Sequence, residues 1–462
     1  MSKAGRPLRL LLLTGEPSGD VLAARVVNRL ASRVARGRGA AARFSHVECH
    51  GLGGAALAKE GLASLFPLKD ISVMGLFEIL PALPRLLVRR RQTIDLVRRL
   101  TEVRAVDAVL SVDAKGFVFP VLRSAAKETR AAGVPVLHAV VPSIWAYRRS
   151  SIAGSAPYGF HLFLDHLFCI LPFEPDWFRD AGVPCTYVGH PAVELVDEWR
   201  TRAARRLALT RGDDASAASG DEDDESSGDE TETAETIDEV ELLHEFYGGD
   251  AADIDTTVGL LPGSRVMELK FALPLMKQVA EQMTAERGGG VAFVLPASSA
   301  VVGEVDAHVA TWKARVRIVS DEPDAKYAAL TLCDAALVVS GTASLECALL
   351  GVPQVCIYDG HPVTAFLARR MARVRHVCIT NIMADRAIIP ELIFRPACTA
   401  DNAKNEIERL LVHGGVIGKR QLADLKPIVD QLRVTPPFAD RMADAVLSKV
   451  VTKEVNAVRP GP

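Results

Sequence analysis

The sequence lacks several patterns that mark metal, redox or membrane proteins. Its eight cysteines are scattered without a C-x-x-C pair, and there is no H-E-x-x-H motif or carboxylate pattern typical of a metal site. No apolar run approaches the roughly eighteen residues of a membrane-spanning helix. Residues 1–7 leave no room for a secretory signal before the first strand-like run. We therefore expect buried thiols in a reducing compartment and no metal cofactor.

Signs of nucleic-acid binding are also missing. Aromatic residues make up 6% of the chain, they do not interleave with basic residues, and no zinc-finger or RNP signature occurs. The formal net charge is −3, but residues 213–241 carry fourteen acidic side chains and no lysine or arginine. Without those fourteen charges the rest of the chain has a formal net charge of +11. A basic body favours anionic ligands or an anionic membrane surface.

What the chain does contain is a repeated alternation of strand-like and helical patterns. Its 462 residues exceed what one core accommodates, so two domains are expected. The strand-like runs of the first half cover residues 8–14, 44–50, 108–112, 134–140 and 166–171. Those of the second half cover residues 257–261, 291–295, 316–319, 335–339 and 354–357. The alternation predicts an α/β protein of two Rossmann-like, doubly wound domains with a cleft between them.

The predicted domain boundaries follow this pattern. We expect a first domain over residues 1–190, a crossover over residues 191–256 and a second domain over residues 257–400. Residues 401–462 show helical patterns only and are expected to form a C-terminal helical tail. Within the crossover, the acidic insertion at residues 212–241 has too few apolar residues to order itself, so we expect a disordered, solvated tether.

Two strand-loop-helix junctions in the second half suit a phosphate. They are Leu260–Arg265, which contains Gly263 and Ser264, and Ser340–Glu346, which contains Gly341 and Thr342. Such a junction directs backbone N–H groups and the positive end of a helix dipole at one point. Arg265 adds a fork for two phosphate oxygens, and Glu346 suits ribose hydroxyls. Ordinary loop chemistry explains either junction alone, but the two together favour a nucleotide.

Polar residues at strand ends of the first half are candidates for catalysis. Asp113 follows the strand-like run 108–112, where a lone carboxylate would accept a proton from an attacking hydroxyl. The alternative role of Asp113 is that of a helix N-cap. His138 and His190 also lie at element ends, and a structural bond to a backbone carbonyl is the favoured role for both.

Residues 71–91 form an unusual apolar segment. Two prolines interrupt it and an arginine cluster, Arg89–Arg91, closes it. An interfacial segment that dips into a bilayer, with arginines reaching back to lipid phosphates, has this composition. A helix packed over the edge of the sheet has it as well, and both interpretations stay open.

Seven short motifs, in order along the chain, resemble those of the lipid-A-disaccharide synthase family, which comprises inverting glycosyltransferases of the GT-B fold. Each motif alone is weak, and the resemblance spans nearly the whole chain apart from the acidic insertion. The motifs are Gly15-Glu16-Pro17-Ser18-Gly19-Asp20, Val73-Met74-Gly75-Leu76-Phe77-Glu78-Ile79-Leu80, Pro142-Ser143-Ile144-Trp145-Ala146-Tyr147-Arg148, Leu171-Pro172-Phe173-Glu174, Val188-Gly189-His190-Pro191, Leu261-Pro262-Gly263-Ser264-Arg265 and Ser340-Gly341-Thr342-Ala343-Ser344-Leu345-Glu346.

The resemblance implies a reaction that the residues alone do not show. UDP-2,3-diacylglucosamine would donate its sugar to 2,3-diacylglucosamine 1-phosphate, giving the β-1,6-linked lipid A disaccharide 1-phosphate and UDP. It implies an acceptor site on the first domain, a UDP site on the second, attachment to an anionic membrane through residues 71–91, and no required metal. A homo-oligomer stays open. We expect a cytoplasmic location, peripheral on the membrane, or an organellar (mitochondrial) one if the chain is eukaryotic. The acidic insertion, unusual for a compact bacterial enzyme, hints at a eukaryotic member.

The resemblance also assigns individual residues. Asp113 matches the family's proposed general base, and we count Glu16 and Ser18 of the first motif as further catalytic candidates. Asn381 matches an asparagine of the family and, with Arg386, is expected around the diphosphate and uridine. The chain departs from the family pattern after Asp113, where the second acidic residue common in bacterial members is absent, so a single base is expected.

Two other functions fit the same features. A soluble GT-B transferase or epimerase acting on UDP-N-acetylglucosamine would use the same fold, but it would have no reason to expose residues 71–91. An inactive sugar-nucleotide-binding protein would account for the altered residues after Asp113 and for the acidic insertion. Release from membranes in low-salt buffer separates the first of these from the synthase, and turnover of the acylated sugars eliminates the second.

Overall fold

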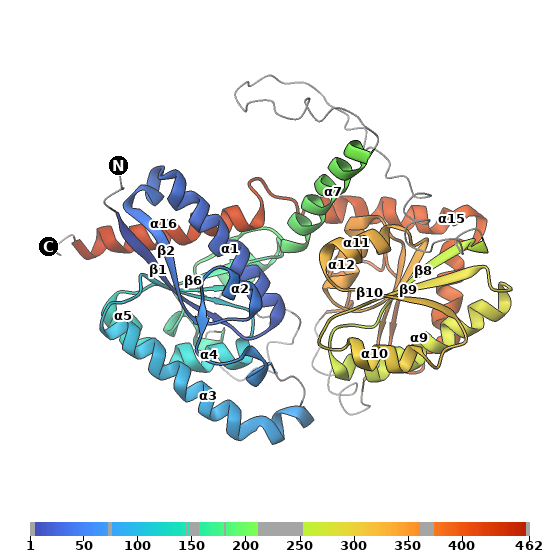
Figure 1. Ribbon diagram of the computed structural model, residues 1–462, viewed down its shortest axis with the longest axis horizontal. Helices are drawn as coiled ribbons and strands as arrows, with labels where there is room; N and C mark the ends of the chain where they lie inside the picture. Colours follow the sequence, from blue (N-terminus) through green and yellow to red (C-terminus); the bar gives the residue numbers. More distant parts are fainter. Residues whose placement is uncertain are drawn as a thin grey trace. The chain divides into compact units, whose positions relative to one another are not determined.

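The chain folds into two compact units, and each is described by itself (Figure 1). The computed structural model describes residues 5–72, 76–141, 143, 146, 157–179, 182–210, 253–360 and 374–458. The first unit consists mainly of Met1–Pro191 and Gln431–Pro462, and the second of Ala192–Arg370 and Val374–Asp430. The acidic insertion at 212–241 lies outside the described residues.

The first unit is built on a parallel sheet with the strand order β3-β2-β1-β4-β5-β6-β7. Its inner strand β1 (Arg6–Thr14) contains a leucine run that is completely buried. Buried, uncharged runs of this kind are typical of parallel strands that are covered on both faces. The other strands are β2 (Phe44–Leu52), β3 (Ala63–Ser64), β4 (Ala108–Val112), β5 (Val136–Ala139), β6 (His166–Cys169) and β7 (Cys185–Tyr187).

Helices cover both faces of this sheet. Leu8, Leu10 and Leu12 belong to one hydrophobic cluster, and Leu11 and Leu13 belong to another, because successive side chains of a strand point to opposite faces. The helices of the unit are α1 (Pro17–Arg36), α2 (Ala55–Lys59), α3 (Leu76–Glu102), α4 (Lys115–Ser124), α5 (Ala126–Ala132), α6 (Glu174–Arg179) and α16 (Phe438–Val458), with 3₁₀ turns at Gly39–Arg43, Leu68–Asp70 and Pro157–Leu162.

The second unit repeats the architecture. Its parallel sheet has the order β10-β9-β8-β11-β12-β13. The strands are β8 (Thr256–Leu261), β9 (Val291–Ala297), β10 (Arg315–Ser320), β11 (Ala335–Val339), β12 (Gln354–Tyr358) and β13 (Glu391–Ile393). The helices are α7 (Pro191–Thr210), α9 (Val266–Glu286), α10 (Val302–Val309), α11 (Pro323–Thr331), α12 (Thr342–Leu350), α14 (Ile379–Ala384) and α15 (Ala400–Asp430). These two doubly wound parallel sheets confirm the predicted α/β fold class.

The C-terminal helices do not form a separate tail. Ala403, Ile407 and Leu410 of α15 are buried in the core of the second unit. Phe438 and Met442 of α16 are buried in the core of the first unit, on the side covered by α1 (Figure 1). The region predicted as one helical tail is therefore shared between the two units, because each helix buries its apolar face in a different core.

Both sheets reverse their strand order next to their first strand. In the first unit the switch lies between β1 and β4, and in the second between β8 and β11. Loops at the carboxyl ends of such strand pairs diverge to opposite faces of the sheet and leave room for a ligand. Asp113 follows β4, and the two phosphate-type junctions follow β8 and β11, so Asp113 and both junctions lie at these switch points.

Helix α3 packs along the first unit and also exposes apolar side chains. Val97 is fully buried, and Arg89 forms an ion pair of 2.6 Å with Asp70. Leu87 and Val88 are 44% and 57% exposed. The Arg89–Asp70 pair holds this part of the helix against the first unit, and the membrane role of residues 71–91 stays a prediction. No helix in the described part of the chain is long and apolar enough to cross a bilayer.

Candidate functional site

Asp113 stands in a strained turn at the end of β4. Its φ is 54°, and the φ of the next residue, Ala114, is 51°. Residues other than glycine seldom adopt positive φ, and aspartate tolerates it better than most. Two consecutive positive φ angles cost of the order of a few kcal/mol and are typical of functional turns. The turn fixes where the Asp113 backbone leaves the sheet before α4 begins at Lys115.

Two glycines of the first motif let the neighbouring loop approach this turn. A Cβ atom on Gly15 would lie 2.4 Å from the Cβ of Ala114, and one on Gly19 would lie 3.0 Å from the carbonyl oxygen of Val112. Neither position has room for a larger residue without movement of the turn. The hydroxyl of Ser72 donates a 2.8 Å hydrogen bond to the Gly15 carbonyl and fixes this loop from the other side.

The polar residues of the same motif have different surroundings. The Asp20 carboxylate is buried and accepts backbone hydrogen bonds from Gly54 (2.6 Å) and Ala56 (2.9 Å), so it caps the start of α2. Glu16 occupies the N-cap of α1, where it is half-buried, and Ser18 lies exposed in the first turn of that helix. Both catalytic candidates thus belong to the helix end that adjoins the Asp113 turn. Their assignment as catalytic residues stays a prediction.

His138 and His190 of the first unit are buried and neutral. His138 accepts or donates a 2.8 Å hydrogen bond between its Nδ1 and the Ser111 hydroxyl. Burial lowers the pKa of His138 to about 3 and the pKa of His190 to about 4. Uncharged imidazoles inside the fold agree with the structural role favoured for both residues.

In the second unit, the loop after β8 presents backbone N–H groups at the start of α9. Gly263 has a φ of 93°, which only glycine adopts readily. The backbone nitrogens of Ser264 and Arg265 lie 3.1 Å and 3.3 Å from Glu268 Oε2, and Arg265 Nη1 lies 2.9 Å from Glu268 Oε1. A carboxylate therefore sits against the N–H groups and the guanidinium that were predicted to bind phosphate. These groups are arranged to hold an anion.

The loop after β11 is the second predicted junction. The Ser340 hydroxyl donates a 3.1 Å hydrogen bond to the carbonyl of Val377 and so supports the loop from behind. Gly341 and Thr342 are exposed at the N-terminal end of α12, and an added Cβ on Gly341 would meet no atom within 4 Å. The residue pairing of Leu261 with Val338 places this junction beside the one after β8. Both junctions therefore face the same edge of the sheet.

Glu346 is buried on α12 within a network of charged and polar partners. Lys326 Nζ lies 3.0 Å and 3.1 Å from its two carboxylate oxygens, and the Tyr327 hydroxyl donates a 2.8 Å hydrogen bond to Oε1. Burial alone would lower the pKa of Lys326, but the carboxylates of Glu346 and Asp321 outweigh it and raise that pKa. The network fixes the orientation of the Glu346 carboxylate, which suits a hydrogen-bond acceptor for hydroxyl groups.

Asn381 requires a correction. Its side chain is fully buried: Nδ2 donates to the Ile389 carbonyl and to Glu391, and Oδ1 accepts from the backbone N–H groups of Ile388 and Ile389. These four bonds use the whole hydrogen-bonding capacity of the amide. Asn381 therefore organises the loop after α14 instead of contacting uridine or diphosphate. Arg386, on the same loop, is exposed and pairs with Asp424 at 3.1 Å.

Sequence reasoning missed Glu268, Lys326 and Tyr327. Glu268 follows Arg265 by three residues, the spacing of a capping box, and that spacing was the available signal. No local pattern points to Lys326 and Tyr327, because their link to Glu346 exists only between helices that are adjacent in space. The motif Pro142–Arg148 lies almost entirely outside the described residues. Within the described ranges, no group of three His, Cys, Asp or Glu side chains is placed to hold a metal ion.

Known families and relatives match nearly the whole chain. The family model described as lipid-A-disaccharide synthetase matches residues 10–215 and 248–431. A lipid-A-disaccharide synthase of Rhodospirillum centenum is 36% identical over 459 residues, which cover 99% of this chain and 98% of the relative. A protein of Arabidopsis thaliana named probable lipid-A-disaccharide synthase, mitochondrial, is 30% identical over 451 residues and covers 95% of this chain and 86% of the relative.

Solved structures with the same fold include glycosyltransferases and epimerases. The glycosyltransferase of kitacinnamycin superposes with a TM-score of 0.54 at 14% identity, covering 96% of this chain and 99% of the other. A UDP-GlcNAc 2-epimerase from Neisseria meningitidis, bound to UDP-GlcNAc, superposes with a TM-score of 0.51 at 10% identity, covering 96% and 100%. At such identities the likeness establishes the fold, which is the GT-B fold expected from the sequence.

Proposed function

This chain belongs to the lipid-A-disaccharide synthase family, and from that membership we propose the details of its reaction. It is a glycosyltransferase of lipid A disaccharide synthesis. We propose UDP-2,3-diacylglucosamine as the donor and 2,3-diacylglucosamine 1-phosphate as the acceptor, with the β-1,6-linked disaccharide 1-phosphate and UDP as products. The proposal names the acylated substrates that the family resemblance implies and gives roles to the residues of this chain.

One observation carries the donor site: two junctions rich in backbone N–H groups lie side by side at the switch point of the second sheet. Gly263, Ser264 and Arg265 form one, and Ser340, Gly341 and Thr342 form the other. The diphosphate of UDP would replace the Glu268 carboxylate at the Ser264 and Arg265 N–H groups, and Arg386 would add a further cation. Glu346, fixed by Lys326, would accept hydrogen bonds from the ribose hydroxyls.

Asp113 is the proposed general base of a single in-line displacement. It would take the proton of the acceptor's 6-hydroxyl while that oxygen attacks the anomeric carbon and UDP leaves from the opposite face. The leaving diphosphate gains negative charge, which the Arg265 guanidinium and the N–H groups of the two junctions would stabilise. Cations and dipoles of the chain supply this stabilisation, so we propose that no divalent metal is required.

The exposed apolar side chains of α3 support a peripheral location on an anionic membrane. Leu83, Leu87 and Val88 are each more than 40% exposed, and basic residues flank them. We propose binding to the membrane surface from the cytoplasm, or from the mitochondrial interior if the chain is eukaryotic. Assembly into a homo-oligomer is compatible with the fold.

The experiment that tests the function uses purified full-length protein. It is incubated with UDP-2,3-diacylglucosamine and 2,3-diacylglucosamine 1-phosphate in buffer with a chelator, and the products are separated by mass. We expect a disaccharide 1-phosphate and one UDP for each bond formed. Turnover only after divalent metal is added would contradict the metal-free mechanism. Turnover of UDP-N-acetylglucosamine instead of the acylated donor would favour the soluble transferase or epimerase.

A further inference from the structure

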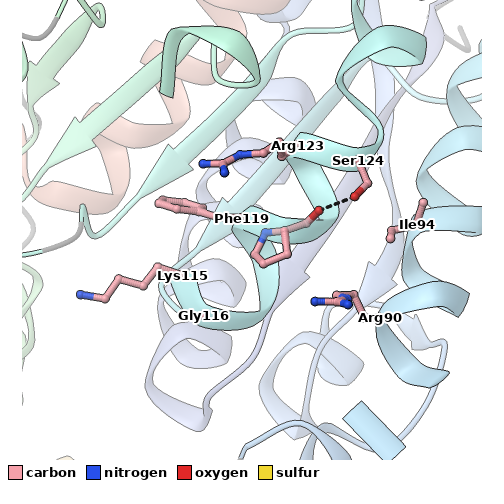
Figure 2. A pocket seen from close by; sticks show the side chains of 8 residues that line it. Arg90, Ile94, Lys115, Gly116, Phe119, Arg123 and Ser124 are labelled. Carbon is pink, nitrogen blue, oxygen red and sulfur yellow. Dashed lines mark hydrogen bonds between the residues drawn. The ribbon is translucent and has the colours of Figure 1, made fainter. Parts of the chain in front are cut away.

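A pocket of about 460 Å³ lies between α3 and α4 of the first unit. Arg90 and Ile94 enter it from α3, and Lys115, Phe119 and Arg123 from α4 (Figure 2). Its volume falls in the range of small-molecule sites, about 300–1,000 Å³. Lys115, which lines the pocket and is the first residue of α4, follows Asp113 by two positions in the chain. The pocket therefore adjoins the proposed base without being part of the donor site.

The charged groups of this pocket have one sign. Arg90, Lys115 and Arg123 are basic, and no acidic side chain is among its described lining residues. Lys115 and Arg123 project from one side of α4 and Arg90 comes from α3 (Figure 2), and each of these cations attracts an anion that enters the pocket. Lys115 and Arg123 are spaced eight residues apart on one side of α4, with Phe119 between them (Figure 2). Lys115 is an exposed residue, but partial desolvation lowers its pKa, and the charge of Asp113 opposes part of that effect.

The remaining wall is apolar and open. Ile94, Phe119 and Pro120 supply hydrophobic surface, and the Phe119 ring is supported edge-on by Phe160 and Phe163. The Arg123 guanidinium lies 5.1 Å from the Phe163 ring centroid, a cation–π contact that holds the guanidinium against this cluster. An added Cβ on Gly116 would meet no atom within 4 Å, so that glycine borders empty space. Cations beside hydrocarbon suit a ligand with a phosphate and an alkyl chain.

We infer that this pocket binds the phosphate group of an acylated phosphosugar, the acceptor of the proposed reaction, through Arg90, Lys115 and Arg123. The inference rests on the proposed function for the identity of the acceptor. The same chemistry, a phosphate joined to acyl chains, also occurs in membrane phospholipids. The acceptor is the stronger choice because the pocket adjoins Asp113, to which only the acceptor must present a hydroxyl. Binding the phosphate here would orient the sugar relative to the base.

The test measures binding without relying on turnover. Full-length protein in neutral detergent is titrated with short-chain 2,3-diacylglucosamine 1-phosphate and with the same lipid lacking its phosphate. Arg90→Gln and Arg123→Gln remove one charge each, and Gly116→Leu fills the pocket sterically. Arg91→Gln is the matched control, since Arg91 is the exposed neighbour of Arg90 on α3 and does not line the pocket. Circular dichroism confirms that each variant is folded.

We expect the two charge variants and Gly116→Leu to weaken binding of the phosphorylated lipid at least about tenfold, the effect of losing one strong charged hydrogen bond. Binding of the lipid without phosphate should change little in the charge variants and fall in Gly116→Leu. The control should behave as the wild type. Equal affinity of all variants for the phosphorylated lipid would overturn the inference.

A second arm separates the two lipid sources. Co-sedimentation with phosphatidylcholine vesicles containing phosphatidylglycerol should be the same for Arg90→Gln and the control. Loss of vesicle binding in Arg90→Gln but not in Arg91→Gln, with unchanged acceptor affinity, would assign the pocket to bulk phospholipid and overturn its assignment to the acceptor. Failure of the proposed function has a different signature, because the wild type would then bind the phosphorylated lipid in this pocket but form no disaccharide.

Discussion

A Cβ atom at position 15 would lie 2.4 Å from the Cβ of Ala114, so the loop after β1 and the turn that carries Asp113 meet through a glycine. Real Cβ atoms do not approach this closely, and a side chain at position 15 must displace the turn. The placement of the proposed base therefore depends on a residue whose own side chain does no chemistry. That dependence can be measured by a pair of substitutions.

Gly15→Ala should lower both the unfolding free energy and the activity. Adding Ala114→Gly to this variant should restore both. The single change forces overpacking at the turn, which typically costs about 1–3 kcal/mol in unfolding free energy. Removing the opposing methyl group in Gly15→Ala/Ala114→Gly restores the space, and glycine also suits the φ of 51° at position 114. Urea unfolding and initial rates of the four proteins give the coupling. Additive losses in the double variant would show that the two residues do not interact.

Asp113→Asn should fold normally and lose at least about 10²-fold in turnover. Asparagine keeps the size of the side chain and tolerates the φ of 54°, but it cannot accept the acceptor's proton. Losing one catalytic group of this kind typically costs about 10²–10⁴ in rate. Initial rates at saturating substrates test this, with Asp176→Asn as the control because Asp176 is an exposed carboxylate of the same unit. Turnover like that of the wild type would remove Asp113 from the mechanism.

Arg265→Ala should weaken the binding of UDP. Arg265 contributes a guanidinium to the anion site, and a charged hydrogen bond is worth about 1.5–3 kcal/mol, or roughly ten- to a hundredfold in affinity. Arg409→Ala is the matched control, since Arg409 forms the same kind of i,i+3 pair, at 2.8 Å from Glu406, on α15. Isothermal titration calorimetry measures both. Equal UDP affinities for the two variants would count against a role for Arg265 in the donor site.

The fold was predictable because buried parallel strands have a strong local signature. The uninterrupted leucine run of β1 and the apolar runs of β8 and β11 are long, uncharged and followed at once by a helical pattern. Strands β3, β7 and β13 contain two or three residues each, which is too few to show a period, and they were missed. Their places are set by pairing with a neighbouring strand, which is a tertiary effect.

Sequence analysis could predict only those site residues that stand close together in the chain. Gly263 and Arg265 stand together in the sequence, and so do the residues of the Gly15–Asp20 motif. The partners of Glu346 lie nineteen and twenty residues away on another helix, and sequence spacing says nothing about them. Asn381 illustrates the opposite error. Its motif suggested a ligand contact, but burial turned its amide inward to four protein partners.

Lys326→Met should destabilise the second unit strongly. Lys326 and Glu346 are only 11% and 8% exposed, so the change leaves a buried carboxylate without its cation. Breaking one partner of a buried pair typically costs about 3–5 kcal/mol. The conservative double change Lys326→Met/Glu346→Gln should recover part of the loss, since no buried charge remains. Denaturant unfolding measures both variants. A double variant as unstable as the single one would show that the unpaired charge is not the cause.

The stability of the first unit should fall as the solution is acidified. Burial lowers the pKa of His138 to about 3, and the pKa values of His166 and His190 to about 4, from the ordinary 6.5. At a pH between the folded and the unfolded pKa, these histidines are protonated in the unfolded chain but not in the folded one. The unfolding free energy therefore decreases as the pH falls from about 6.5 to about 4. Each histidine contributes up to about 1.4 kcal/mol per pH unit in this window.

Replacing one of these histidines tests the origin of the acid sensitivity. His138→Gln removes one titrating group while keeping a polar side chain opposite Ser111, so its unfolding free energy should depend less steeply on pH between about 6 and 4 than that of the wild type. His46→Gln is the control, because His46 is an exposed histidine of the same unit. Urea unfolding is measured at several pH values for all three proteins. Identical slopes for His138→Gln and the wild type would show that folding does not lower the pKa of His138.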